Sequence, residues 1–239
     1  MGADDVDAFD GGFSGGIRGA REHADDNEDR ARTHRNGSLL RASAAAVVAK
    51  RPAMLVGGCP SGYAVGTRMQ ATVRLVETAR DLEGILALQR ASRAPTSDGF
   101  VTVEHTLAIL QAMHALAPSV IAVDARGDVV GYALVMPRET RTLVPILEPM
   151  FALIDELGLA YRWYVMGQVA VAPAHRGSGL FDAMYAEHRA RYRDRFDAVI
   201  TEIATRNTRS VRAHARVGFE TLVTHRDATD EWALVAWAF

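Results

Sequence analysis

Glycines and one arginine follow an apolar stretch of the sequence at a spacing that suits the binding of an anion. Residues 168–171 end a predicted buried strand, Pro173 terminates it, and residues 176–179 open a predicted amphipathic helix. The first N–H groups of a helix have no acceptor within it, and glycine lets a phosphate approach the backbone closely. We therefore expect residues 176–180 to bind a diphosphate, with Arg176 adding positive charge. The alternative is a tight strand-to-helix connection that binds nothing.

The same turn differs from two common nucleotide-binding motifs. It is not a P-loop, because no lysine follows the second glycine and Lys50 is the only lysine in the chain. It does not complete a G-x-G-x-x-G motif either, since Asp182 occupies the last glycine position. Residues 12–16 match the G-x-S-x-G motif of serine hydrolases, but the strand and helix that this motif needs are not predicted around them. We take that match as chance.

A second stretch carries a carboxylate, an amide and an imidazole. Glu202 lies near the middle of a predicted strand, and Asn207 is placed to cap the next helix through the N–H of Arg209 or Ser210. His214 lies on that helix, on the side that faces the ends of the preceding strands. This stretch therefore places a carboxylate and an imidazole on two consecutive predicted elements.

Together the two stretches resemble the GNAT superfamily of acyl-CoA-dependent N-acetyltransferases, over about residues 72–239. The resemblance rests on Arg176-x-x-Gly179 after a Val-Ala-Val-x-Pro strand, and on Asn207-x-x-Ser210 before a helix that closes in Arg-Val-Gly-Phe. It implies acetyl-CoA as co-substrate, without a metal. One departure is Phe181, which occupies the last Gly/Ala position of the family's turn, so the phosphate can approach there only if the ring turns to the core. By this resemblance, the cofactor-binding residues are Val169, Ala170 and Val171 on the strand, Arg176, Gly177, Ser178, Gly179 and Leu180 at the turn, and Asn207.

The resemblance also implies catalytic roles for Glu202 and His214. Glu202 matches a strand glutamate that acts as general base in some members; alternatively, it pairs with Arg206 or Arg209, or binds the acceptor amine without taking its proton. His214 stands where many relatives have the tyrosine that protonates the departing thiolate. An imidazolium with an ordinary pKa of about 6.5 suits that step. The alternative is a packed structural histidine, with Tyr185 or water as the proton donor.

The acceptor is the least defined partner. The insertion at residues 137–162 carries apolar side chains, which predict either a lid over the acceptor or a dimer surface anchored by Met150 and Phe151. An apolar lid favours a small acceptor. We therefore predict transfer of an acetyl or short acyl group from acyl-CoA to a primary amine of a small molecule, by a monomer or homodimer. The alternatives are a non-catalytic acyl-CoA sensor of the same fold and a protein-interaction domain.

The elements that position these residues alternate in mixed order, which predicts an α/β fold. The resemblance implies a GNAT fold, in which a mixed central sheet has antiparallel N-terminal strands, a splayed parallel pair and helices on both faces. Predicted strands are 72–77, 119–123, 129–136, 163–171, 198–204, 219–224 and 232–237, and predicted helices begin at Thr78 and run at 103–116, 148–157, 178–193 and 208–217. A turn at residues 125–128 makes the second and third strands an antiparallel hairpin.

Composition limits the remaining classes of protein. The 239 residues include 27 Lys plus Arg and 29 Asp plus Glu, so there is no basic excess for nucleic acid. No uncharged apolar run is long enough to cross a membrane. A lone Cys59 makes no internal disulfide and the acidic start is unlike a signal peptide, so we expect a cytoplasmic protein. The histidines show no metal-ligand spacing.

Residues 1–68 differ in composition from the rest. They hold eleven of the 20 glycines and keep no apolar period, so we predict a disordered tail with a short helix at 38–48. Residues 69–239 are predicted to form the domain. Within it, the arginine-rich run at 189–195 is expected to be a solvated helix face, with contact to the adenosine 3′-phosphate as the alternative.

Overall fold

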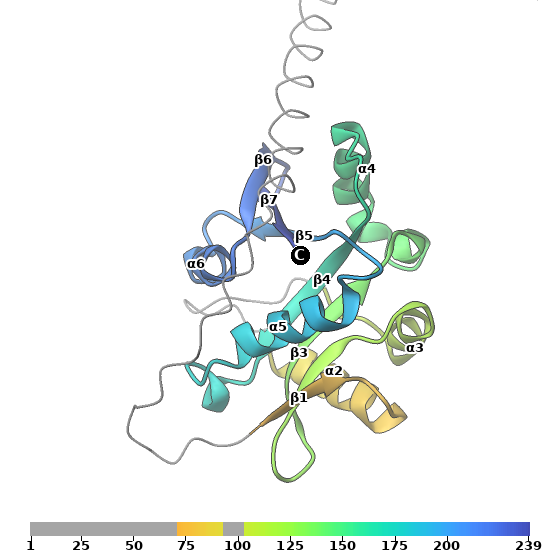
Figure 1. The fold of residues 1–239 in the computed structure, drawn as a ribbon, viewed down its shortest axis with the longest axis vertical. Coiled ribbons are helices and arrows are strands. Elements are labelled where there is room, and N and C mark those ends of the chain that lie inside the picture. The colour runs from red at the N-terminus through yellow and green to blue at the C-terminus, as the bar shows by residue number, and fades with distance from the viewer. Residues whose placement is uncertain (1–70, 93–102) are drawn as a thin grey trace, which may run out of the picture. The chain divides into compact units, whose positions relative to one another are not determined.

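The computed structural model describes residues 71–92 and 103–239, which form a seven-stranded sheet with helices on both faces (Figure 1). The predictions for the tail, the helix at 38–48, Cys59 and the match at residues 12–16 lie outside the described residues. The strands are β1 (Thr72–Leu75), β2 (Val120–Val123), β3 (Val129–Met136), β4 (Trp163–Val171), β5 (Ala198–Ala204), β6 (Glu220–Arg226) and β7 (Glu231–Ala238). The helices are α2 (Ala79–Ala91), α3 (Leu107–Leu116), α4 (Glu148–Leu157), α5 (Leu180–Tyr192) and α6 (Thr208–Val217), with short 3-10 helices η1 (Arg138–Thr142), η2 (Pro145–Leu147) and η3 (Pro173–His175).

The strands follow the order β1-β2-β3-β4-β5-β7-β6. Every neighbouring pair is antiparallel except β4 and β5, which are parallel. The hairpin of β2 and β3 closes through residues 124–128, where the N–H of Asp124 donates to the carbonyl of Asp128 at 3.0 Å. This arrangement confirms the predicted mixed α/β sheet with an antiparallel N-terminal part and one parallel pair.

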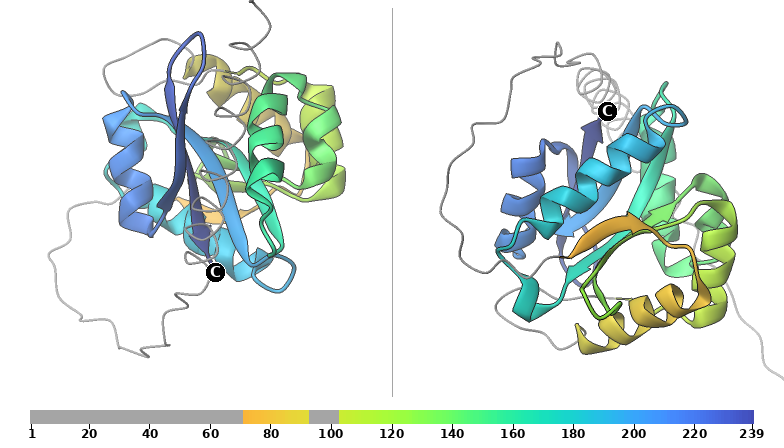
Figure 2. Two further views of the ribbon diagram at one scale, coloured as in Figure 1. Left: turned by 90° about the horizontal axis from the view of Figure 1, so that it is seen from above. Right: turned by 60° about the horizontal axis from the view of Figure 1, so that its bottom comes forward.

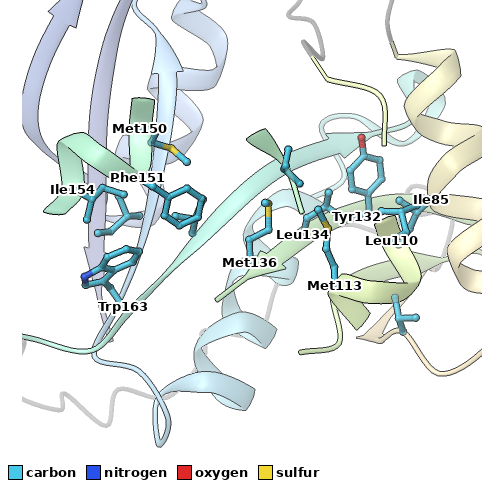
Figure 3. Packing of buried hydrophobic residues seen from close by; sticks show 14 of the residues in the cluster. Ile85, Leu110, Met113, Tyr132, Leu134, Met136, Met150, Phe151, Ile154 and Trp163 are labelled. Carbon is cyan, nitrogen blue, oxygen red and sulfur yellow. The ribbon is translucent and has the colours of Figure 1, made fainter. Parts of the chain in front are cut away.

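The helices divide between the two faces of the sheet. Side chains from α2, α3 and α4 share one hydrophobic cluster with alternate residues of β3, β4 and β5, such as Leu134, Val165 and Ile200 (Figure 3). The alternate residues on the other face, among them Val199 and Ile203, pack in a second cluster with Tyr185 of α5. In Figure 2 (left), α6 and α4 lie on opposite sides of the strands. The face of a strand residue therefore decides which helices it meets.

Helix starts follow their capping residues. Thr78 accepts the N–H of Asp81, whose carboxylate in turn accepts the N–H of Thr78, so α2 begins with a capping box at the predicted Thr78. The predicted start of the next helix at Val103 is wrong, because Thr106 caps α3 by accepting the N–H of Ile109 and the helix begins at Leu107. The other predicted ends match the structure or differ from it by at most two residues.

The insertion before β4 is built into the core. Its apolar residues Met150, Phe151 and Ile154 on α4 are at most 4% exposed and pack in the same cluster as Trp163 (Figure 3). Met150 and Phe151 therefore cannot anchor a dimer surface, and that expectation is wrong for these two side chains. Amphipathicity alone could not distinguish a face buried within the chain from one buried against a partner. Ile146 on η2 stays exposed, at 67%.

The two parallel strands separate after a short paired region. β4 and β5 pair only from Trp163 to Val165 and from Ala198 to Ile200. Beyond it, the register of β3 with β4 shifts near Gly167, which marks a β-bulge. A side chain at Gly167 would put its Cβ 1.9 Å from Met136 Sδ, so a larger residue here would require the buried Met136 side chain to move. The result is a gap between β4 and β5 in the middle of the sheet.

No helix in the ranges 71–92 and 103–239 has the length and apolarity of a membrane span.

Candidate active site

The glycine turn between β4 and α5 has the backbone of an anion site. Gly177 and Gly179 have φ values of +75° and +86°, which a side chain would strain, and a Cβ at either position would meet nothing within 4 Å. Gly179 caps α5, and the first backbone bond within that helix runs from the N–H of Ala183 to Gly179. The N–H groups of the first turn are therefore free of helix partners beside an open space.

The turn is held from within rather than by a ligand. The Ser178 hydroxyl donates to the carbonyl of His175 at 2.6 Å, and Arg176 Nε donates to the carbonyl of Val171 at 3.2 Å. Arg176 thereby ties the turn to the end of β4. Arg176 also lines the cavity described next and adds positive charge to it.

A cavity of about 600 Å³ opens beside this turn. It is bounded by the end of β4, by the turn and the start of α5, and by the first two turns of α6. Its positive charges come from Arg176, Arg209, Arg212 and Arg216, and Asp182, which also lines it, pairs with Arg216 at 2.8 Å. All nine predicted cofactor-binding positions except Ser178 line the cavity; they are Val169, Ala170, Val171, Arg176, Gly177, Gly179, Leu180 and Asn207. Such a basic cavity suits an elongated polyanion.

A smaller cavity of about 90 Å³ lies in the gap between β4 and β5. Val169, Asn207 and Ser210 line both cavities, so the two are adjacent. On one side the gap is lined by α6 residues, and on the other by Glu202 of β5 and Trp232 of β7. The gap thus connects the cavity at the glycine turn with the opposite face of the sheet.

α6 is fixed where the two cavities meet. The Asn207 side chain accepts the N–H of Ser210 at 3.2 Å and caps the helix, as predicted. Gly218, with φ +115°, ends the helix. His214 lies inside, 2% exposed, with Nδ1 donating to the carbonyl of Ser210 at 2.8 Å and Nε2 lying 2.8 Å from the Tyr185 hydroxyl. With Nδ1 as donor, Nε2 accepts from Tyr185 and the ring is neutral.

Burial changes the acid-base properties of His214 and Tyr185. Burial lowers the pKa of His214 to about 4 and raises the pKa of Tyr185 well above its usual value. The imidazolium expected from an ordinary pKa is therefore not populated at neutral pH, a consequence of depth that the sequence spacing does not show. The ring of Phe181 packs edge-on to His214 with centroids 5.1 Å apart. Phe181 thus turns to the core while still bordering the larger cavity.

Glu202 points to the face of the sheet opposite α6. Glu202 is two residues after Ile200 on β5, so its side chain lies on the same face of the sheet as that of Ile200. Its carboxylate binds Nε2 of His225 on β6. Of the two arginines named as alternative partners of Glu202, Arg206 binds Asp230 and Arg209 lines the larger cavity. Burial raises the pKa of the Glu202 carboxyl, an effect that His225 partly offsets. A raised pKa brings a carboxylate closer to the range useful for a general base.

A buried polar network at the bulge was not predicted from the sequence. Gln168 Oε1 accepts from Gln89 Nε2 at 2.8 Å and from the Tyr132 hydroxyl at 2.6 Å, while Gln168 Nε2 donates to the carbonyl of Val103 at 2.8 Å. The network joins α2, β3 and β4 beside the gap. Each member is an isolated polar residue in an apolar stretch, which is the only sequence signal it leaves. The network holds the β-bulge of β4 in place beside the part of the small cavity that Glu202 lines.

Within residues 71–92 and 103–239, no cluster of His, Cys, Asp and Glu could hold a metal ion. His105 and His188 are both buried and belong to no such cluster. Burial lowers the pKa of each.

Comparison with known proteins agrees with this geometry. Residues 85–219 match the model of the acetyltransferase (GNAT) family. Among solved structures, a GNAT superfamily phosphinothricin acetyltransferase from Sinorhizobium meliloti, in complex with acetyl-CoA, is similar at 21% identity and TM-score 0.52, covering 72% of this chain and 89% of that chain. A ribosomal-protein-alanine N-acetyltransferase from Brucella melitensis is similar at 21% identity and TM-score 0.53, covering 70% and 99%. These two likenesses show a shared fold. No curated protein sequence matches the chain.

Proposed function

Because the chain belongs to the acetyltransferase (GNAT) family, we propose that it transfers an acetyl or short acyl group from acyl-CoA to a primary amine of a small acceptor. The observation that carries the proposal is the continuity of the two cavities. The basic cavity at the glycine turn adjoins the small cavity in the gap between β4 and β5. The partly buried carboxylate of Glu202 lines the far side of that gap. The positive charge at the larger cavity and the carboxylate beyond the gap suit a polyanionic donor whose reactive end must reach an acceptor.

The residues at the larger cavity suit coenzyme A. The N–H groups of the α5 first turn and the glycines with open space beside them would bind the diphosphate, with Arg176 adding charge. The edge of β4 over Val169–Val171, freed by the separation of β5, would pair with the amide groups of the pantetheine arm. Solved relatives of the same fold hold acetyl-CoA, which supports this assignment. When bound, the thioester supplies the activated acyl group.

Glu202 is proposed as the general base. An amine must lose a proton to act as a nucleophile, and a carboxylate at the far side of the gap lies where the acceptor would enter. The partial burial that raises its pKa makes Glu202 a better base than an exposed carboxylate. Binding the amine without taking its proton remains the second role open to the same side chain.

His214 is proposed as a residue that holds the site rather than as the acid. A neutral ring with a pKa of about 4 has no proton to give at neutral pH except the Nδ1 proton held by Ser210. Tyr185 is no better, because a phenol with a pKa well above that of a thiol, about 8.5, gives its proton unfavourably. We therefore propose that the sulfur leaves as the thiolate and takes its proton from the aqueous solvent, where hydronium and buffer acids are stronger acids than the thiol.

The test is release of free thiol from acetyl-CoA with a panel of primary amines, from small alkyl and aromatic amines to amino acids and peptides with free N-termini. The two similar enzymes are named for a small molecule and for a protein alanine, so the fold leaves both acceptor types in the panel. We expect release with at least one small amine. Saturable acetyl-CoA binding without release for any amine would instead support the non-catalytic sensor.

A further inference from the structure

His225 is the one ring of β6 that reaches the carboxylate of Glu202. β5 and β6 both pair with β7, where Glu202 lies opposite Leu234 and His225 opposite Trp232, two residues apart on the same face. This diagonal across the middle strand lets His225 Nε2 bind Glu202 Oε1. A contact of this kind depends on β7 lying between the two strands.

The two side chains differ in their access to solvent. The side chain of Glu202 is 18% exposed and that of His225 is 27% exposed. A carboxylate that is this deeply buried loses hydration and favours its neutral form unless a donor replaces the lost water. His225 supplies such a donor from the rim at Oε1, and Glu202 itself lines the small cavity in the gap.

The other groups described around Glu202 do not favour its ionised form. Gln168 and Trp232, which also line the small cavity, carry no charge. Among the described residues, the charged or titratable groups that act on Glu202 are His225, which favours its ionised form, and Asp227 at the end of β6, which opposes it. His225 is therefore the group whose contact favours the ionised form of Glu202, against the effects of burial and of Asp227.

We propose that His225 is a positioning residue for the acyl transfer, which keeps Glu202 ionised and directs its free oxygen into the gap between β4 and β5. This rests on the proposed function, in which Glu202 takes a proton from the acceptor amine. The N–H bond of the amine breaks as an O–H bond forms on Glu202, and the electron pair stays on nitrogen. His225 keeps its own proton throughout and touches neither substrate.

The test compares His225→Phe, which removes the donor, with His225→Gln, which keeps an N–H near the position of Nε2. Arg226→Gln is the control, because Arg226 is the next residue on β6 and its exposed ion pair with Glu231 is away from the gap. The rate constant kcat/KM is measured against pH with one amine for all variants, so that the titration of the amine cancels in the ratios. The titration of the Glu202 carboxyl is followed by carbon-13 NMR, with Glu202→Gln assigning the signal.

We expect the Glu202 midpoint in His225→Phe to rise by about one pH unit or more, and kcat/KM on the acid limb to fall about tenfold. His225→Gln should stay within about threefold of the wild type, and Arg226→Gln should match it. A wild type that is active while His225→Phe keeps the same midpoint and the same acid limb would overturn this inference alone. A wild type that releases no thiol with any amine would overturn the proposed function, and this role with it.

Discussion

The two sides of the gap between β4 and β5 differ in the groups that line them. The side at the glycine turn is lined by the stretch from Val169 to Leu180, whose backbone is proposed to bind the donor, and by α6 with its arginines. The other side consists of side chains from β4, β5 and β7, supported by β6 and α2. Backbone binding tolerates varied side chains, whereas proton transfer needs one carboxylate held in one orientation. The first side should therefore govern donor affinity, and the second should govern rate.

The largest effect is expected from Glu202→Gln. The amide keeps the shape of the side chain but cannot take a proton, so kcat should fall about 100-fold. Acetyl-CoA affinity, measured by calorimetry, should stay within about twofold because Glu202 lies across the gap from the larger cavity. Loss of affinity with unchanged kcat would contradict the division between the two sides.

The next effect is on folding. His214→Ala removes the partner of the buried Tyr185 hydroxyl and leaves a hole beside Phe181, which should cost about 2 kcal/mol of unfolding free energy. Turnover per folded molecule should change by less than about threefold, since the native ring is neutral. A tenfold loss of turnover in fully folded protein would instead restore His214 as the acid.

The same residue predicts a dependence of stability on pH. The folded pKa of His214 is about 4, below its unfolded value of about 6.5, so between these values the unfolded chain binds more protons. Unfolding free energy should therefore fall as pH drops from 6.5 to 4, and less steeply in His214→Ala. Urea unfolding at several pH values measures both slopes. Equal slopes would show that His214 titrates alike in both states.

Donor affinity is tested by a matched pair of glycines. Gly179 at the turn and Gly127 in the hairpin both have φ +86° and open space beside them. Alanine at either site should cost a similar stability of about 1 kcal/mol. Only Gly179→Ala should weaken acetyl-CoA binding, by about tenfold, because its methyl group stands where a phosphate would approach. Equal affinities would remove the turn from the binding site.

The smallest effect is expected from Asp182→Asn. This carboxylate lines the larger cavity and forms an exposed pair with Arg216, so stability should change by no more than about 0.5 kcal/mol. Acetyl-CoA affinity should rise by up to about threefold, less so in high salt. Glu187→Gln, which breaks a pair with Arg191 on the same helix, is the control and should leave affinity unchanged.

The contrast between the two sides also explains what the sequence could predict. The strand, proline, glycines and helix of the turn are consecutive, so local spacing was enough to find them and the resemblance to place them in a fold. His225 is 23 residues from Glu202, and their contact requires β7 to lie between β5 and β6. Sequence spacing does not show strand order.

Burial was the other property that local pattern could not supply. His214 was correctly placed on the inner side of its helix, but its pKa depends on how completely Tyr185, Phe181 and Phe219 enclose it. The helix α4 was likewise found from its period, while its apolar face proved to pack in the core rather than on a partner. The members of the Gln168 network come from separate helices and strands, so no periodic pattern along the sequence links them.

The most direct test of the central claim is a calorimetric titration of the full-length protein with acetyl-CoA. If the glycine turn and the free edge of β4 bind the donor, the titration saturates at one molecule per chain, with a Kd between about 1 μM and 1 mM, the range of ordinary enzyme substrates. Absence of any saturable heat at millimolar acetyl-CoA would contradict that claim.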